Sequence, residues 1–128
     1  MSSTDHVDVL IVGAGISGIG VAYHLMDQRP GTTFAILEAH PSYGGTWWTH
    51  RYPGVRSDSD LFTLGYRFKA WHGNPIARGE QILEYLGEVI DDNELDRHIR
   101  YRHRVEAAEW SSETSTWTVT ATDLDAER

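Results

Sequence analysis

Residues 7–18 read VDVLIVGAGISG, and this stretch decides the fold. Its first half, residues 8–12, is a continuous apolar run of the kind that forms a buried strand in a parallel sheet. Its last six residues form a G-x-G-x-x-G loop, and apolar side chains then recur at helical spacing over about 15–28. A second apolar run follows at 33–38. Strand, glycine loop, helix and strand in this order predict a βαβ unit that binds the ADP half of a dinucleotide.

The glycines of the loop have separate roles. Gly13 permits the tight turn, Gly15 lets the backbone approach a diphosphate, and Gly18 lets the helix pack closely on the strand. The helix start offers unpaired N–H groups to an anion, and the hydroxyl of Ser17 adds a donor. Glu38 ends the second apolar run, where it would accept both ribose hydroxyls and repel a 2′-phosphate. FAD or NAD is therefore expected here rather than NADP. The alternatives are a glycine turn without a ligand and an exposed acid at a strand end.

The composition excludes several classes of function. The chain has 128 residues and a net charge of −8, which argues against nucleic acid as a partner because phosphate binding needs a basic face. There is no cysteine, so disulfides, thiolate ligands and a cysteine nucleophile are excluded. The histidines form no H-E-x-x-H pair, and no metal site is expected. The apolar stretch 7–26 follows Asp5 rather than basic residues and is interrupted by glycines. Neither a secretion signal nor a membrane span is therefore expected, and we expect a cytoplasmic protein.

The rest of the chain predicts further elements of an α/β domain. Residues 39–79 lack periodicity and are rich in glycine, proline, serine and aromatic side chains, which is unusual for a loop without a function. An amphipathic helix is expected over 80–92, one or two strands over 98–110 and another strand over 117–121, with a hairpin turn over 111–116. These elements predict a Rossmann-like fold, incomplete at its C-terminal side because a doubly wound sheet needs more parallel strands.

Two features near the C-terminus are interpreted without a ligand. Trp110 and Trp117 flank the expected hairpin, where we expect them to pack in the core. The basic cluster at 97–104 is interpreted as a solvated strand edge rather than a nucleotide clamp.

A second glycine-rich segment lies in the aperiodic region. Residues 44–48 read GGTWW, and residues 51–60 read RYPGVRSDSD. The paired glycines, the second of which is Gly45, again permit close backbone approach. Thr46 can donate to a phosphate, and Trp47 is a flat apolar surface suited to lie near an isoalloxazine ring. The alternative is a local turn with a surface aromatic cluster, and Asp58 taken alone is typical of a turn or cap.

Three motifs in this order resemble a known family. GAGISG at 13–18, GGTW at 44–47 and RYPG-x-R-x-D at 51–58 are similar to the N-terminal FAD-binding segment of class B flavoprotein monooxygenases, and most similar to the Baeyer–Villiger monooxygenases. Residues 56–68 and 96–100 resemble the branch that contains the mycobacterial monooxygenase that activates ethionamide. The resemblance covers essentially the whole chain, whereas family chains are several times longer. It implies that residues 1–128 are the N-terminal part of an FAD-binding domain, without the NADPH domain.

The resemblance also implies roles for particular residues. The side chains that would contact FAD are those of Ser17, Glu38, Thr46, Trp47 and Asp58. The backbone of Val105 would meet the adenine, and Arg56, Ser57 and Asp58 would lie where the nicotinamide reaches the flavin. Asp58 is similar to the family's catalytic aspartate, which pairs with an arginine that lies beyond Arg128 in family members. Arg51 and Arg56 do not take the place of that arginine.

The implied activity is that of an FAD- and NADPH-dependent monooxygenase. By resemblance, O₂ reacts with the reduced flavin to give a C4a-peroxide that oxidises a ketone or a soft sulfur. One alternative is an NAD(P)-linked dehydrogenase, which the GGTW segment disfavours. The other is a non-catalytic flavin-binding fragment. The chain lacks a second G-x-G-x-x-G and the F-x-G-x-x-x-H-x-x-x-W fingerprint, so we expect the 128 residues alone to be inactive.

Overall fold

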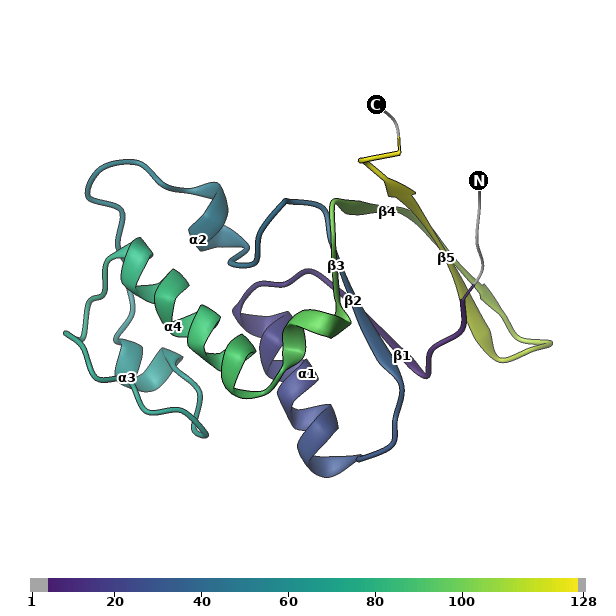
Figure 1. Cartoon of the computed structure of the whole chain (residues 1–128), viewed down its shortest axis with the longest axis horizontal. Coiled ribbons are helices and arrows are strands. Elements are labelled where there is room, and N and C mark those ends of the chain that lie inside the picture. The colour runs from purple at the N-terminus through teal and green to yellow at the C-terminus, as the bar shows by residue number, and fades with distance from the viewer. Residues whose placement is uncertain (1–4, 127–128) are drawn as a thin grey trace.

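A computed structural model describes residues 5–126 and shows a parallel three-stranded sheet. Its strands are β1 (Val9–Val12), β2 (Phe34–Glu38) and β3 (Ile99–Tyr101), in the order β1-β2-β3 (Figure 1). The central strand β2 is buried at every position, as expected for a strand with covered faces. The predicted βαβ unit is confirmed, and its two strands end next to each other, at the edge where the glycine loop begins.

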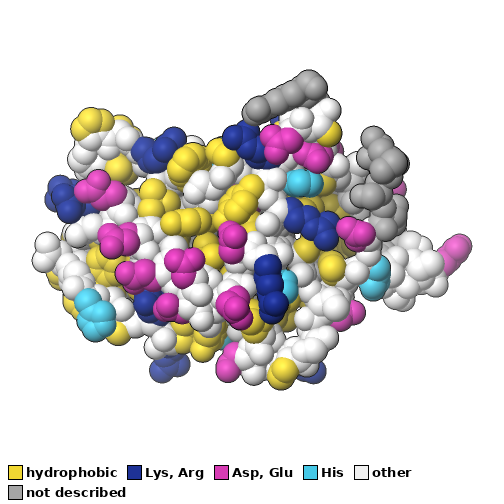
Figure 2. Space-filling view, viewed as in Figure 1, with side chains coloured by type: hydrophobic (Ala, Val, Ile, Leu, Met, Phe, Trp, Pro, Cys, Tyr) yellow, Lys and Arg dark blue, Asp and Glu magenta, His cyan; other side chains and the backbone are white. Residues whose placement is uncertain are grey.

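Two helices cover one face of this sheet and enclose the core. They are α1 (Ile16–Gln28) and α4 (Gly79–Asp92), and both agree with the helices expected from the sequence. The core joins Ile36 of the sheet to Ile19 of α1 and Leu86 of α4, all fully buried. A short 3₁₀ helix, η1 (Leu95–His98), leads from α4 into β3. The other face of α4 carries exposed carboxylates, which appear as magenta side chains across the front of the molecule in Figure 2.

The aperiodic segment between β2 and α4 holds only two single-turn helices. These are α2 (Thr46–Thr49) and α3 (Leu61–Leu64). The side chain of Asp60 caps α3 by accepting a hydrogen bond of 2.7 Å from the N–H of Phe62. An isolated antiparallel bridge between Arg56 and Arg78 fastens the segment to the start of α4. The absence of periodicity therefore reflects short, tertiary-supported turns rather than an unstructured loop.

An antiparallel ribbon follows the parallel sheet. It consists of β4 (His103–Ser111) and β5 (Thr116–Asp123) and, in Figure 1, lies on the side of the sheet away from α1 and α4. The expectation that Trp110 and Trp117 belong to the core is wrong. Their rings face each other at 5.5 Å between centroids, yet the residues are 51% and 62% exposed. The ribbon forms a two-stranded sheet of its own, on which the two tryptophans stay largely open to solvent.

The basic cluster lies along β3 and the start of β4, in agreement with a solvated edge. Arg100 pairs with Asp5 at 3.1 Å, and Arg104 pairs with Glu106 at 2.8 Å. Such exposed pairs contribute little to stability. Among the residues described, no helix is long and apolar enough to cross a membrane.

Candidate cofactor site

The glycine loop connects β1 to α1 and has the backbone that its sequence predicts. Gly13 has a φ of 101°, a conformation that favours glycine, and its N–H donates to the carbonyl oxygen of Leu37 at 2.9 Å. A Cβ atom on Gly18 would collide with the carbonyl oxygen of Gly13 and would also lie 3.3 Å from Ile11 Cγ2. The close approach of helix and strand at Gly18 is therefore confirmed.

The start of α1 presents backbone donors. Gly15 is the N-cap and has no capping side chain. Among residues 5–126, no acceptor takes up the N–H groups of the four residues 15–18. The hydroxyl of Ser17 is on the exposed side of this turn, and it too has no partner in that range. Together with the positive end of the helix dipole, these donors suit an anion such as a diphosphate.

The second glycine turn meets the first. Gly44 donates its N–H to the carbonyl oxygen of Ala14 at 2.9 Å, which fastens the two loops together. Gly45 has a φ of 55°, and a Cβ atom placed on it would lie 3.1 Å from Gly15 Cα. The N–H groups of Gly45 and Thr46 have no acceptor in the described chain. Two loops distant in sequence thus bring unpaired backbone donors to one place, and the close approach depends on glycine at position 45.

Glu38 is buried beneath the first glycine loop. The residue is only 5% exposed, and its Oε1 accepts from the N–H of Ala14 at 2.9 Å while Oε2 accepts from the N–H of His40 at 2.8 Å. In the described residues no cation pairs with this carboxylate. Burial raises the pKa of Tyr101 to about 12, with the charges of Asp96 and Glu38 adding to the effect. The contact between Glu38 and the glycine loop is a structural role that its sequence position did not reveal.

The two tryptophans after the second glycine turn have different surroundings. Trp47 is half-buried against the core, and its Cε3 would lie 3.6 Å from a Cβ atom on Gly79, at the start of α4. The guanidinium of Arg51 lies 3.7 Å from the ring centroid of Trp48, in a cation–π contact. Thr46 is exposed at the start of α2. A bound flavin near Trp47 remains a prediction.

The remaining predicted residues differ in accessibility. Ser57 is buried at 3% exposure, and its Oγ accepts a hydrogen bond of 3.1 Å from the N–H of Ala77. Arg56 and Asp58 on either side are exposed. Val105 is partly buried in β4, immediately before a bulge in the ribbon. Ser57 therefore fastens residues 56–58 to Ala77, a role that the sequence did not indicate, whereas its contact with a nicotinamide stays a prediction.

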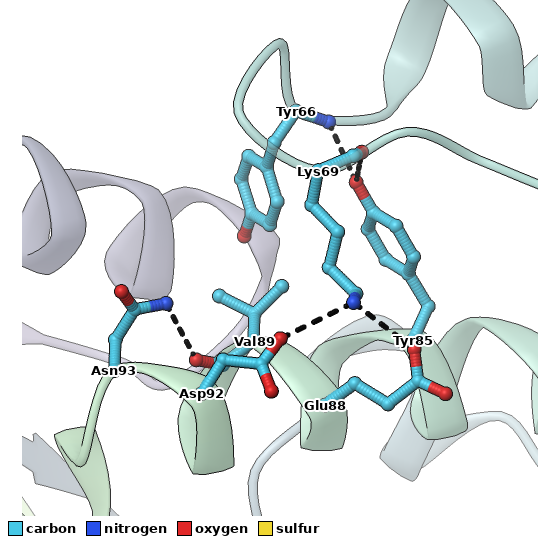
Figure 3. A network of polar contacts seen from close by, with 7 residues as sticks. All are labelled: Tyr66, Lys69, Tyr85, Glu88, Val89, Asp92 and Asn93. Atoms are coloured by element: carbon cyan, nitrogen blue, oxygen red, sulfur yellow. Dashed lines mark hydrogen bonds and ion pairs between the residues drawn. The ribbon is translucent and has the colours of Figure 1, made fainter.

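A polar network behind the glycine loop was missed at the level of sequence. Tyr85 of α4 donates its hydroxyl hydrogen to the carbonyl oxygen of Lys69 at 2.7 Å and accepts from the N–H of Tyr66 at 2.9 Å. The amine of Lys69 lies 3.3 Å from carboxylate oxygens of both Glu88 and Asp92 (Figure 3). The apolar periodicity of α4 could have indicated that Tyr85 is buried, but not what its hydroxyl binds.

Comparison with known proteins agrees with this geometry. The FAD-containing monooxygenase EthA of Mycobacterium tuberculosis is 53% identical over 117 residues, which cover 91% of this chain and 24% of the relative. The probable FAD-binding monooxygenase AlmA of Acinetobacter baylyi is 48% identical over 119 residues, covering 92% of this chain and 24% of that protein. The chain therefore spans about a quarter of the length of the curated relatives it matches. The resemblance to flavoprotein monooxygenases is confirmed.

Solved structures match over a similar range. An oxidised steroid monooxygenase bound to NADP superposes with a TM-score of 0.83 at 36% identity, covering 90% of this chain and 23% of the other. A cyclohexanone-bound cyclohexanone monooxygenase gives a TM-score of 0.81 at 30% identity, covering 90% of this chain and 24% of that one. The expected Rossmann-like fold is thereby confirmed.

The chain also matches a known domain family over the elements that build the site. The NAD(P)-binding Rossmann-like domain matches residues 11–88, which run from β1 through both glycine turns and into α4. This match takes in more than half of the chain, and it includes the end of β1, α1 and β2, on which the site depends. The chain therefore belongs to the family of NAD(P)-binding Rossmann-like domains.

Proposed function

We propose that residues 1–128 are the N-terminal part of the FAD-binding domain of an FAD- and NADPH-dependent monooxygenase, with the NADPH-binding domain outside these residues. The observation that carries the proposal is the meeting of the two glycine turns at Gly15 and Gly45, where unpaired backbone donors gather above the buried Glu38. A diphosphate bound by the first loop alone would leave the unpaired donors of the second loop without a ligand. A ligand that contacts both loops would use both sets of donors. The similar proteins are FAD-containing monooxygenases, which supports FAD as that ligand.

The cofactor would be held from its adenosine end towards its ring. The loop of Gly13, Gly15, Ser17 and Gly18 would bind the diphosphate from one side, with Gly13 forming the turn and residues 15–18 supplying N–H groups, and Gly45 and Thr46 would bind it from the other. Each carboxylate oxygen of Glu38 uses one acceptor site on a backbone N–H and keeps another for a ribose hydroxyl. The backbone of Val105 would meet the adenine, and Trp47 would support the ring.

The exposed segment around Asp58 would serve the second cofactor and the reaction. FAD, when bound, supplies the redox and oxygen chemistry, whereas protein groups supply binding, orientation and electrostatics. Arg56, Ser57 and Asp58 would lie where NADPH reaches the flavin. As a carboxylate, Asp58 would fix the geometry of an arginine that is not among these residues. We assign Asp58 the role of the catalytic aspartate by resemblance.

The proposed substrates are small molecules. The solved structures similar to this chain include a cyclohexanone-bound monooxygenase, which supports a ketone as substrate together with O₂, with a soft sulfur as the alternative. We propose a cytoplasmic location. Nucleic acid is not a proposed partner, because the net charge of −8 opposes binding to phosphate backbones.

Titration of the purified 128-residue chain with FAD, followed by flavin fluorescence and absorption, tests the proposal. We expect saturable binding of FAD and none of comparable strength for NAD or NADP. Gly45→Ala should weaken FAD binding at least about tenfold, because Gly45 has a positive φ and the added methyl group would press on Gly15. Gly31→Ala is the matched control, since Gly31 also has a positive φ but nothing lies within 4 Å of its Cβ position.

The outcomes separate the rival functions. A folded chain that binds NAD in preference to FAD would support the dehydrogenase. The chain alone should not consume NADPH in the presence of a ketone. Ketone-dependent NADPH consumption by these 128 residues would overturn the assignment of the NADPH domain to another part of the protein. Circular dichroism confirms that each variant is folded before its binding is compared.

A further inference from the structure

Tyr66 connects the segment before α4 to the first turn of α1. It lies just after α3, and its ring stacks on Phe68 and Tyr85, with 4.6 Å and 5.9 Å between ring centroids. Its hydroxyl donates a hydrogen bond to the carbonyl oxygen of Ile16, the first residue of α1. Figure 3 shows the phenol oxygen directed away from Tyr85 and towards the neighbouring helix.

Gly20 makes this contact possible. Its backbone lies beside the same tyrosine, whose hydroxyl is bonded to the carbonyl oxygen of Ile16 in the first turn of α1. A Cβ atom on Gly20 would lie 2.9 Å from Cε1 of Tyr66, which is too close for unstrained packing. The glycine at position 20, which lies outside the G-x-G-x-x-G loop, thus accommodates the tyrosine ring.

Tyr66 is itself held from α4. Its N–H donates to the hydroxyl of Tyr85 at 2.9 Å, and that hydroxyl donates to the carbonyl oxygen of Lys69 at 2.7 Å. The amine of Lys69 is in turn paired with Glu88 and Asp92, one turn apart on α4. Burial raises the pKa of Tyr66 far above its usual 10.0, so its hydroxyl remains a donor throughout the physiological range.

The same helix also touches the second glycine turn. A Cβ atom on Gly44 would collide with Cδ2 of Leu83, so the side chain of Leu83 packs directly against that turn. α4 therefore contacts Gly44 through Leu83 and reaches α1 through Tyr85 and Tyr66. This makes α4 a common support for the two turns that meet at Gly15 and Gly45.

We propose that Tyr66 is a positioning residue for the dinucleotide diphosphate, because its hydroxyl fixes the first turn of α1 relative to the second glycine turn. The inference rests on the proposed function, since it assigns the diphosphate to the unpaired N–H groups of residues 15–18. Those N–H groups belong to the same helical turn as the carbonyl of Ile16, to which the hydroxyl of Tyr66 donates. A change in that turn would alter the direction of the donors without removing any of them.

The test compares Tyr66→Phe with Tyr23→Phe in the 128-residue chain. Tyr23 lies on α1, and its ring stacks on Phe68 with 3.5 Å between ring centroids. Its hydroxyl has no partner in the described chain. Tyr66→Phe should weaken FAD binding by about three- to tenfold, the effect of one net hydrogen bond. Tyr23→Phe should leave it unchanged. Gly20→Ala, which keeps the hydroxyl but displaces the ring, should weaken binding as Tyr66→Phe does.

A spectroscopic measurement distinguishes positioning from general destabilisation. The phosphorus NMR resonances of bound FAD should shift in Tyr66→Phe at saturating FAD and stay at the wild-type positions in Tyr23→Phe, whose lost hydroxyl has no partner in the described chain. Unchanged affinity and unchanged resonances in folded Tyr66→Phe would overturn the inference and leave the proposed function standing. Failure of the folded wild-type chain to bind FAD would instead overturn the proposed function.

Discussion

The buried carboxylate of Glu38 accepts a hydrogen bond of 2.9 Å from the N–H of Ala14, in the middle of the glycine loop. The acid that ends β2 therefore shapes the loop that follows β1, in addition to the ribose contact proposed for it. This relationship changes how a substitution at position 38 must be interpreted, because the same carboxylate supports the fold and is proposed to bind the ribose.

Replacing Glu38 should therefore affect stability as well as binding. Glu38→Ala leaves the buried N–H of Ala14 without an acceptor, and we expect the free energy of unfolding to fall by about 1–3 kcal/mol in urea titrations. Glu38→Gln keeps one carbonyl oxygen as an acceptor and should cost less. If folded Glu38→Gln bound FAD as tightly as the wild type, the ribose role of the carboxylate would be excluded.

Gly18 should be the least replaceable glycine of the first loop. Gly18→Ala forces the helix away from Gly13, and we expect a loss of at least about 2–3 kcal/mol, because the atom it meets is backbone and cannot rotate away. Gly54→Ala serves as the control. Gly54 has a φ of 84° but open space around its Cβ position, so the expected cost is about 1–2 kcal/mol of backbone strain. Thermal unfolding of both variants gives the comparison, and equal losses would contradict the packing argument.

Replacing Ser57 should lower the stability of the protein even when no cofactor is bound. Ser57→Ala leaves the N–H of Ala77 buried and unpaired, with an expected cost of about 1–3 kcal/mol in the free energy of unfolding. Ser59→Ala is the matched control, because Ser59 is exposed and has no partner among residues 5–126. A Ser57→Ala chain as stable as the control would show that the hydrogen bond to Ala77 contributes nothing.

His98 should make the fold sensitive to acid. Its ring stacks on Phe34 at 4.2 Å between centroids, and burial, with a further contribution from Arg97, holds its pKa below the usual 6.5. The unfolded chain therefore binds a proton more readily than the folded one. Stability is expected to fall as pH drops through 6.5 towards the lower pKa of the folded state and to be unaffected by this group above pH 6.5.

Urea titrations at several pH values between 5 and 8 test this expectation with His98→Phe. The phenylalanine keeps a ring to stack on Phe34 but cannot titrate, so the decline of stability on acidification should be shallower than in the wild type. A decline as steep as that of the wild type would assign the acid sensitivity to other groups.

The sequence by itself determined the βαβ unit, the two glycine turns and the position of the acid at the end of β2. These are local properties, because a G-x-G-x-x-G loop, an apolar run and a helical period each depend on neighbours in the chain. The need for glycine at position 18 follows in the same way, since strand, loop and helix are contiguous. The resemblance to flavoprotein monooxygenases likewise rests on three linear motifs.

Only the tertiary structure decided which of these segments touch. The contact between Gly15 and Gly45, the bond from Ala14 to Glu38 and the insertion of Tyr66 beside Gly20 join residues far apart in the sequence. No local periodicity encodes such contacts, because they depend on how separate elements pack against one another. For the same reason Trp110 and Trp117 were misassigned: alternation predicts a strand, but burial requires a covering element, which no strand pattern specifies.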